Sequence, residues 1–318
     1  MNRNYLPMNA AVLMDRVFDL YKSTFKTQIV FSLIIGIIFS ILIVVSSIVL
    51  AFGVTMAMYV GDGLYYDSDR YIIAVVLVVL ASVLPLYIIW IYLSSSGHIL
   101  ISKQAFYNQP VELPFRDTFK ALLRVLSSAF AQLIMIIPWL IPVVAITLLS
   151  VGNDFAFLYS VHPFLMVLFV LIFAVLLLIY TNIFALSIPI AIFEKRLFFA
   201  TITRSFQLIK DDFWKILGLR LLWALIIYLF SYSAQGLIIT IIAIITMLTG
   251  NIIDFGYLLM ATGTVQFYAS LLVAILMGPM EGIMTALIFF NQKIKKDGLD
   301  IEICLNRLAK SHNSGERS

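Results

Sequence analysis

Long apolar stretches with almost no charge constrain this chain more than any other feature. Residues 27–54, for example, contain no Asp, Glu, Lys or Arg. A hydrocarbon core about 30 Å thick is crossed by about 20 apolar residues in a helix. Inside lipid, every backbone N–H and C=O must be satisfied within the protein, which leaves helices or a closed barrel. Because the apolar residues are continuous and do not alternate with polar ones, the sequence predicts helices that span a membrane.

Composition leads to the same conclusion. Of the 318 residues, 62% are hydrophobic and 12% are charged, so the chain has more apolar surface than one soluble core of this size could bury. The single cysteine, Cys304, excludes an intramolecular disulfide framework and a cysteine-rich zinc site. No cleavable signal peptide is apparent, so we expect the first apolar run to act as an uncleaved anchor.

We predict an all-α, polytopic membrane protein with about six transmembrane helices arranged as three hairpins. The predicted domains are a cytoplasmic amphipathic N-terminal segment (1–26), a six-helix transmembrane domain (27–292) and a cytoplasmic C-terminal tail (293–318). The predicted spans cover residues 27–54, 71–97, 126–150, 164–192, 214–247 and 262–291.

The basic residues predict the orientation. Of the 21 Lys and Arg residues, only Arg70 falls on one side of the predicted spans; the others lie on the opposite side, with Lys215 and Arg220 at the start of predicted span 214–247. Retained basic residues mark the cytoplasmic side, so both termini are expected in the cytoplasm. This asymmetry also accounts for the net charge of +4 without a nucleic-acid partner.

Two segments of the chain match each other. RVFDLYKSTF (16–25) and RSFQLIKDDF (204–213) share Arg, Phe, Leu, Lys and Phe at the same offsets, which places Arg16 and Lys22 in correspondence with Arg204 and Lys210. The match indicates a repeated unit, with a third and weaker copy starting at Phe115. We expect each unit to begin with an amphipathic helix on the cytoplasmic membrane surface, before its pair of spans.

The apolar stripes of these amphipathic segments follow from helical spacing. The first stripe comprises Met14, Phe18, Tyr21 and Phe25, and the third comprises Phe198, Ile202, Phe206 and Ile209. Each even-numbered span also contains one proline (Pro85, Pro189 or Pro279), where the lost backbone hydrogen bond can kink the helix.

Polar side chains within the spans are the candidate functional residues. Glu281, Arg220, Asn182 and Gln235 form the candidate intramembrane polar site, because ionisable and amide groups in lipid must be paired or hydrated. Two interpretations stay open: a network that packs helices together, or a polar path for transport. Glu194, between span four and two basic residues, is interpreted as an interfacial residue.

Catalytic chemistry has little support in the sequence. His98, His162 and His312 fall in separate parts of the predicted topology, and no metal-binding or nucleophile motif is present. We therefore expect no enzyme activity, no catalytic or metal-ligating residue and no cofactor.

Three stretches resemble the bacterial membrane-domain family named after glycerophosphoryl diester phosphodiesterase. They are AVLMDRVFDLYKSTFK (11–26), IPIAIFEKRLFFATITRSFQLIKDDFWKILGL (188–219) and LIFFNQKIKKDGLDIEICL (287–305). The resemblance implies a multi-span module of the bacterial plasma (inner) membrane without the catalytic domain. The expected function is a non-enzymatic scaffold, assembly factor or membrane subunit, with membrane lipids and a protein on the cytoplasmic face as partners. The alternative is a transporter or lipid-handling protein with a polar path near Glu281 and Arg220.

Overall fold

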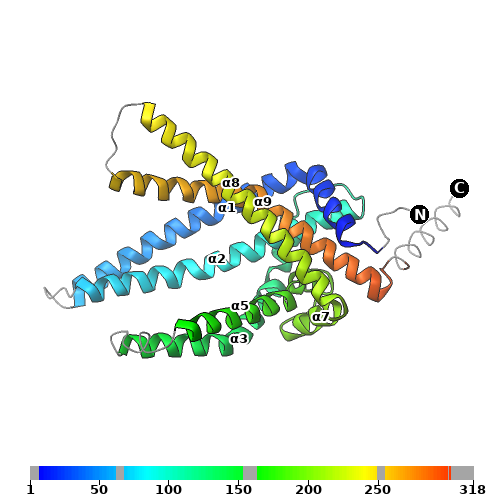
Figure 1. Cartoon of the computed structure of the whole chain (residues 1–318), viewed down its shortest axis with the longest axis horizontal. Coiled ribbons are helices and arrows are strands. Elements are labelled where there is room, and N and C mark those ends of the chain that lie inside the picture. Colours follow the sequence, from blue (N-terminus) through cyan, green and yellow to red (C-terminus); the bar gives the residue numbers. More distant parts are fainter. Residues whose placement is uncertain (1–6, 62–67, 153–162, 249–254, 300, 302–318) are drawn as a thin grey trace. The chain divides into compact units, whose positions relative to one another are not determined.

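A computed structural model describes residues 7–61, 68–152, 163–248, 255–299 and 301, and within these ranges it contains helices and no strand (Figure 1). His162, Cys304 and His312 lie outside the described residues. The α-helices are α1 (Ala10–Gly61), α2 (Ser68–Phe106), α3 (Phe115–Gly152), α5 (Pro163–Ile183), α6 (Ser187–Phe193), α7 (Phe199–Ile209), α8 (Phe213–Leu248) and α9 (Phe255–Asp297).

The helices confirm the predicted fold class. Six stretches are long and apolar enough to cross a membrane, one for each predicted span. Large aliphatic side chains on these helices are exposed, including Ile48 and Val49 on α1. In a membrane such side chains contact lipid, so their exposure carries no cost in free energy. The chain is therefore an all-α, multi-pass membrane protein.

The chain divides into two compact units, each built from segments far apart in the sequence. Unit 1 comprises Met1–Asp19, Leu123–Tyr232 and Ile283–Ser318, and unit 2 comprises Leu20–Leu122 and Ser233–Gly282. The two units are described separately below.

The amphipathic segments differ in how they join their spans. In the first pair, the predicted surface segment and span one form the single helix α1, and the middle segment is likewise continuous with its span in α3. Before span five, by contrast, α7 is a separate helix, followed by the 3₁₀ turn η2 (Lys210–Asp212).

The side-chain contacts of the two matching segments also differ. In α1, the hydroxyls of Ser23 and Thr24 donate hydrogen bonds to the Leu20 carbonyl of the same helix at 3.0 and 2.7 Å. The corresponding positions in the second segment are Asp211 and Asp212, whose carboxylates bind lysines of α9 instead. Equal offsets in the sequence therefore do not give equal backbone conformations.

The predicted apolar stripes do not coincide with the faces buried in the protein. Leu13 and Val17 are buried in α1, whereas Phe18 is exposed despite an edge-on contact with Trp223 in unit 1. In α7, Ile202 and Ile209 are buried, but Phe198 and Phe206 are about half exposed. The protein-facing side of α7 instead includes Thr201 and Ser205, which form the hydrogen bonds described below.

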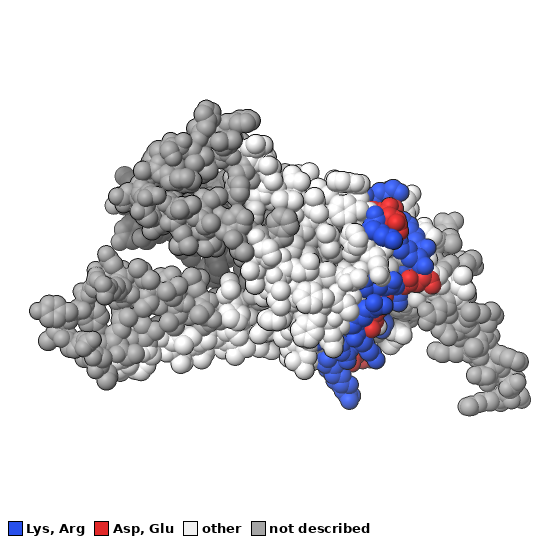
Figure 2. All heavy atoms as spheres, turned by 90° about the horizontal axis from the view of Figure 1, so that it is seen from below, with Lys and Arg blue, Asp and Glu red and all other residues white. Residues whose placement is uncertain are grey.

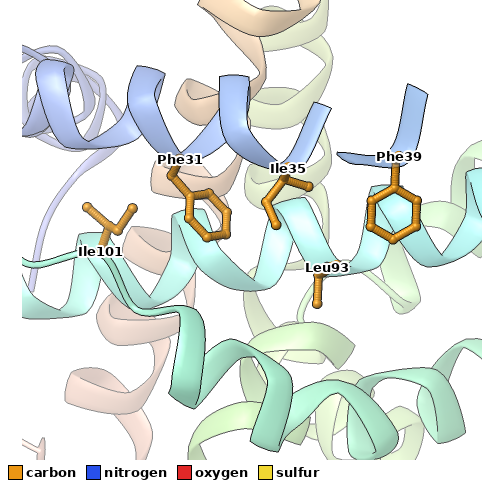
Figure 3. Packing of buried hydrophobic residues seen from close by; sticks show 5 residues of the cluster. All are labelled: Phe31, Ile35, Phe39, Leu93 and Ile101. Carbon is orange, nitrogen blue, oxygen red and sulfur yellow. The ribbon is translucent and has the colours of Figure 1, made fainter. Parts of the chain in front are cut away.

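The core of unit 2 lies between α1 and α2. Phe31, Ile35 and Phe39 of α1 point toward α2, whose Leu93 and Ile101 belong to the same cluster (Figure 3). The Phe31 ring occupies the space beside Gly97, where an added Cβ would lie 2.0 Å from the ring. The absence of a side chain at position 97 thus allows the aromatic ring to pack against the α2 backbone.

A buried polar network joins the same two helices. His98 of α2 is fully enclosed: its Nδ1 lies 2.5 Å from Gln28 Oε1, and its Nε2 lies 3.2 Å from both Ser32 Oγ and Ser94 Oγ. Gln28 Nε2 faces the His98 carbonyl at 3.5 Å, which directs the amide oxygen toward Nδ1. This orientation places the ring proton on Nδ1 and leaves Nε2 to accept hydrogen bonds from the serine hydroxyls.

Replacing Gly282 by alanine tests the close packing in unit 2. A Cβ at Gly282 would lie 2.5 Å from His98 Cβ, so the helix backbones must separate, and we expect a loss of about 1–3 kcal/mol of stability. Gly278→Ala, one turn earlier in α9, is the matched control because nothing lies within 4 Å of its added Cβ. Thermal unfolding in detergent should show a lower midpoint for Gly282→Ala only. Equal midpoints for the two variants would contradict the close packing.

Candidate functional site

Span four is interrupted within unit 1. Helix α5 ends at Ile183 and α6 begins at Ser187, with a turn at residues 184–186. Pro189 lies in the first turn of α6, where a missing N–H is tolerated. Because proline has no N–H, it cannot donate the helical hydrogen bond to the carbonyl four residues earlier. Pro85 and Pro279, by contrast, lie inside the continuous helices α2 and α9. Of the three prolines, only Pro189 therefore follows an interruption of the helix.

Ser205 of α7 bridges this interruption. Its hydroxyl donates to the Ile183 carbonyl at 2.5 Å and accepts from the Leu186 N–H at 3.3 Å. These are backbone groups on the two sides of the turn, and Ser205 is fully buried. Because unpaired backbone groups are costly in an apolar environment, this contact stabilises the interruption and fixes α7 against span four.

Further polar side chains bond to backbone groups around the same turn. Arg220 Nη1 donates to the Thr181 carbonyl at 2.9 Å, and Asn182 Nδ2 donates to the Phe213 carbonyl at 3.3 Å. Gln132 Nε2 of α3 donates to Ser187 Oγ at 2.6 Å. The interrupted span is thus connected to α3, α7 and α8 by hydrogen bonds.

The four residues of the predicted intramembrane site are divided between the units. Asn182 and Arg220 belong to unit 1 and lie at the interruption, whereas Gln235 and Glu281 belong to unit 2. Glu281 is exposed on α9. The contacts of Asn182 and Arg220 are those of groups that support the helix backbone, which favours the packing interpretation for this pair.

A cluster of ion pairs lies beside the interruption. Glu194, whose side chain is only 11% exposed, accepts contacts from Arg196 Nε at 3.1 Å, Arg204 Nε at 3.2 Å and Lys293 Nζ at 3.7 Å. Arg204 also pairs with Asp297 at the end of α9. Glu194 therefore lies at the centre of the cluster, and the three bases supply the countercharges that a largely buried carboxylate requires.

The turn η2 forms the second half of this ion-pair cluster. Asp212 binds Lys295 Nζ at 2.6 Å and Lys215 Nζ at 3.2 Å, and it accepts a hydrogen bond from Gln292 Nε2 at 3.2 Å. Asp211 pairs with Lys296 at 2.5 Å. Figure 2 shows acidic side chains among basic ones in a band across one face, and uncharged residues on one side of this band.

The surroundings of the Asp211 and Asp212 carboxyl groups in η2 favour their ionised state. Asp211 and Asp212 precede the apolar stretch of α8, outside predicted span 214–247. The hydrogen bond from the Lys295 ammonium is the main cause that lowers the pKa of Asp212 to about 2, and the bond from Lys296 likewise lowers the pKa of Asp211. Both carboxylates therefore stay charged in neutral and mildly acidic solution.

The turn between α6 and α7 has a strained backbone. Lys195 and Phe198 have positive φ angles of 55° and 48°, which residues other than glycine rarely adopt. Such a conformation costs about 1–3 kcal/mol per residue and persists only where surrounding contacts hold it. Here the Phe198 N–H donates to Ser127 Oγ at 3.4 Å, and the Phe198 carbonyl accepts from Thr201 Oγ1 at 2.6 Å.

The repeat residues have unequal surroundings. Arg204 is at the centre of the ion-pair cluster, whereas Lys210 and Lys22 are exposed, and Arg16 is half-buried in α1. Sequence reasoning did not single out Gln28 or Ser32. One available signal was the helical spacing of small polar residues within apolar stretches, such as Gln28 with Ser32 and Ser94 with His98.

No known protein family, curated protein or solved structure matches the chain. The resemblance to the membrane-domain family therefore stays a prediction.

The arrangement of charges indicates the physical role of the site. Among the described residues of the ion-pair cluster, each carboxylate binds at least one Lys or Arg, and acids do not gather around a common point. Within the described ranges, no group of three His, Cys, Asp or Glu residues is placed to hold a metal ion. The site is arranged to hold helices α6, α7 and α9 together at one end of unit 1.

Removing the Ser205 hydroxyl tests the bridge across span four. In Ser205→Ala, the Ile183 carbonyl and the Leu186 N–H lose their shared partner while buried, so we expect a loss of about 1–3 kcal/mol of stability. Thr203→Ala is the control, since Thr203 is exposed on the same helix and bonds only to the Phe199 carbonyl. Chemical denaturation in detergent micelles measures both variants. A loss of stability in Thr203→Ala as large as in Ser205→Ala would argue against the bridge.

Proposed function

We propose that this protein is a non-enzymatic membrane subunit or scaffold that holds a partner protein at the ion-pair cluster of unit 1. The observation that carries the proposal is the cluster itself, which connects the end of α6 and α7 to the end of α9. Arg204 and Asp297, which pair in this cluster, are 93 residues apart in the sequence. Its acids are engaged by bases, which suits a preorganised binding surface better than proton transfer or metal binding.

The geometry of the cluster supports recognition by a protein. Asp211 exposes 65% of its side chain, and Lys295, Lys296 and Asp297 are partly exposed, so charges of both signs reach the surface in fixed positions. Fixed, partly exposed charges give specificity and steer association with a complementary surface. Because these side chains are already held by ion pairs, a partner would lose little side-chain entropy on binding them.

A site-specific cross-link tests this function. A photoreactive amino acid at Gln207, exposed on α7 beside the cluster, should give one reproducible protein adduct in intact cells. The same amino acid at Leu225, exposed on the apolar part of α8, is the control and should give none. Glu194→Gln should reduce the Gln207 adduct about tenfold, because a buried carboxylate that pairs three cations is removed. The proposal fails if Gln207 gives no adduct, or if Glu194→Gln leaves its adduct unchanged.

The proposed location is the plasma (inner) membrane of a bacterium, with both termini and the ion-pair cluster in the cytoplasm. Its support is the distribution of basic residues: 18 of the 21 Lys and Arg flank the predicted spans on one side, Lys215 and Arg220 lie at the start of the span that enters from that side, and only Arg70 lies on the other.

Cysteine labelling tests the orientation. With Cys304→Ser as background, Lys120→Cys lies in the proposed cytoplasmic segment between spans two and three, and Asp154→Cys in a predicted outer loop. A membrane-impermeant maleimide should label Asp154→Cys in intact cells, and Lys120→Cys only after permeabilisation. The opposite pattern would reverse the orientation.

A further inference from the structure

The α6–α7 turn and α7 present a second surface beside the ion-pair cluster. Ser205 and Ile202 face the interior of unit 1, and the polar side of α7 carries Arg204 and contacts the end of α9. A third face, with Phe199, Phe206 and Lys210, is exposed. These three residues are spaced by seven and four positions, so they share one side of the helix.

The strained turn extends this exposed face. Lys195 and Phe198, the two residues with positive φ, bracket Arg196 and Leu197, and all four side chains are exposed. At the other end of α7, Trp214 is 74% exposed. The turn thus places exposed Leu197 and Phe198 directly before Phe199 of α7, and such a group of exposed apolar side chains is typical of a surface that contacts a membrane or a partner.

The exposed charge on this surface is mainly positive. Lys195, Arg196, Lys210 and Lys215 are exposed, and the Lys215 side chain is 83% exposed. Among the acids of the same segment, Glu194 and Asp212 are largely buried within the ion-pair cluster, where Arg196 and Lys215 pair with them from the exposed edge, and Asp211 binds Lys296. The surface therefore complements an anionic ligand.

The connectivity of the chain decides which anionic ligand fits. Helix α6 ends at Phe193 and α8 starts at Phe213, and predicted spans 164–192 and 214–247 put the 19 residues between these helices on one side of the membrane. This short connection keeps α7 near the lipid headgroups. Aromatic and basic side chains together are typical of a segment at that depth, where rings enter the acyl boundary and cations meet phosphates.

We propose that the α6–α7 turn and the exposed face of α7 bind anionic phospholipids. Lys195, Arg196, Lys210 and Lys215 contact the headgroup phosphates, while Phe198, Phe199, Phe206 and Trp214 enter the outer part of the acyl layer. This surface shares Arg196 and Lys215 with the edge of the ion-pair cluster, whereas Lys195, Lys210 and the aromatic side chains lie outside it.

Quenching of Trp214 fluorescence tests the proposal. The full chain with Trp90, Trp139 and Trp223 replaced by Phe is reconstituted into phosphatidylcholine vesicles that contain a minor fraction of brominated lipid. Brominated phosphatidylglycerol should quench Trp214 at least about twofold more than the same fraction of brominated phosphatidylcholine. The difference should disappear in Lys210→Gln/Lys215→Gln, and it should persist in the control Lys120→Gln, an exposed cation of unit 2.

A second reporter protects the test against misfolding, since Trp223 is buried and its replacement could destabilise unit 1. A fluorophore on Phe206→Cys, with Cys304→Ser, is examined in the same lipids with all tryptophans present. Equal quenching of either reporter by the two brominated lipids would overturn the preference for anionic lipid. Absence of quenching by both lipids would overturn membrane contact and assign the face to a protein partner.

Discussion

Satisfaction of backbone hydrogen bonds inside hydrocarbon is the constraint on which this structure depends. In a continuous helix the backbone groups bond to each other and need no partner from another segment, which is why long helices dominate the described residues. Span four does not meet it alone, because the chain is interrupted before Pro189. Ser205 supplies the missing partners from α7, and Arg220 supports the same region from α8. The Ser205 contacts hold α7 against span four, beside the ion-pair cluster.

Close approach of helices and buried hydrogen bonds stabilise each of the two units separately, by the same physical means. Lipid provides little hydrophobic drive for helix association, so small residues and polar contacts gain importance. In unit 2, Gly97 and Gly282 admit Phe31 and His98 to the neighbouring backbones, and Gln28 and Ser32 bond the histidine ring. In unit 1, Thr201 and Ser205 on α7 have the corresponding role.

Charged residues at the start and end of α7 serve two purposes. Glu194, Arg204 and Asp212 organise helices through largely buried pairs, whereas Lys195, Lys210 and Lys215 expose their charge. The sequence predicted an amphipathic helix at this place, but not which of its charges would be paired. That distinction depends on the end of α9, whose Lys293–Asp297 segment lies more than 80 residues further along the chain.

The sequence by itself determined the all-α class, the number of spans and their approximate limits, because these follow from the length and neutrality of apolar stretches alone. It also located Asn182 and Arg220 as polar groups that need partners in lipid. Only the tertiary structure decided what those partners are: the backbone of an interrupted helix for Arg220, and a phenylalanine carbonyl for Asn182. It also made the two matching segments unequal, since Asp211 and Asp212 meet lysines of α9 while Ser23 and Thr24 bond to their own helix. Partners distant in sequence cannot be found from local periodicity, because periodicity describes only neighbours along one helix.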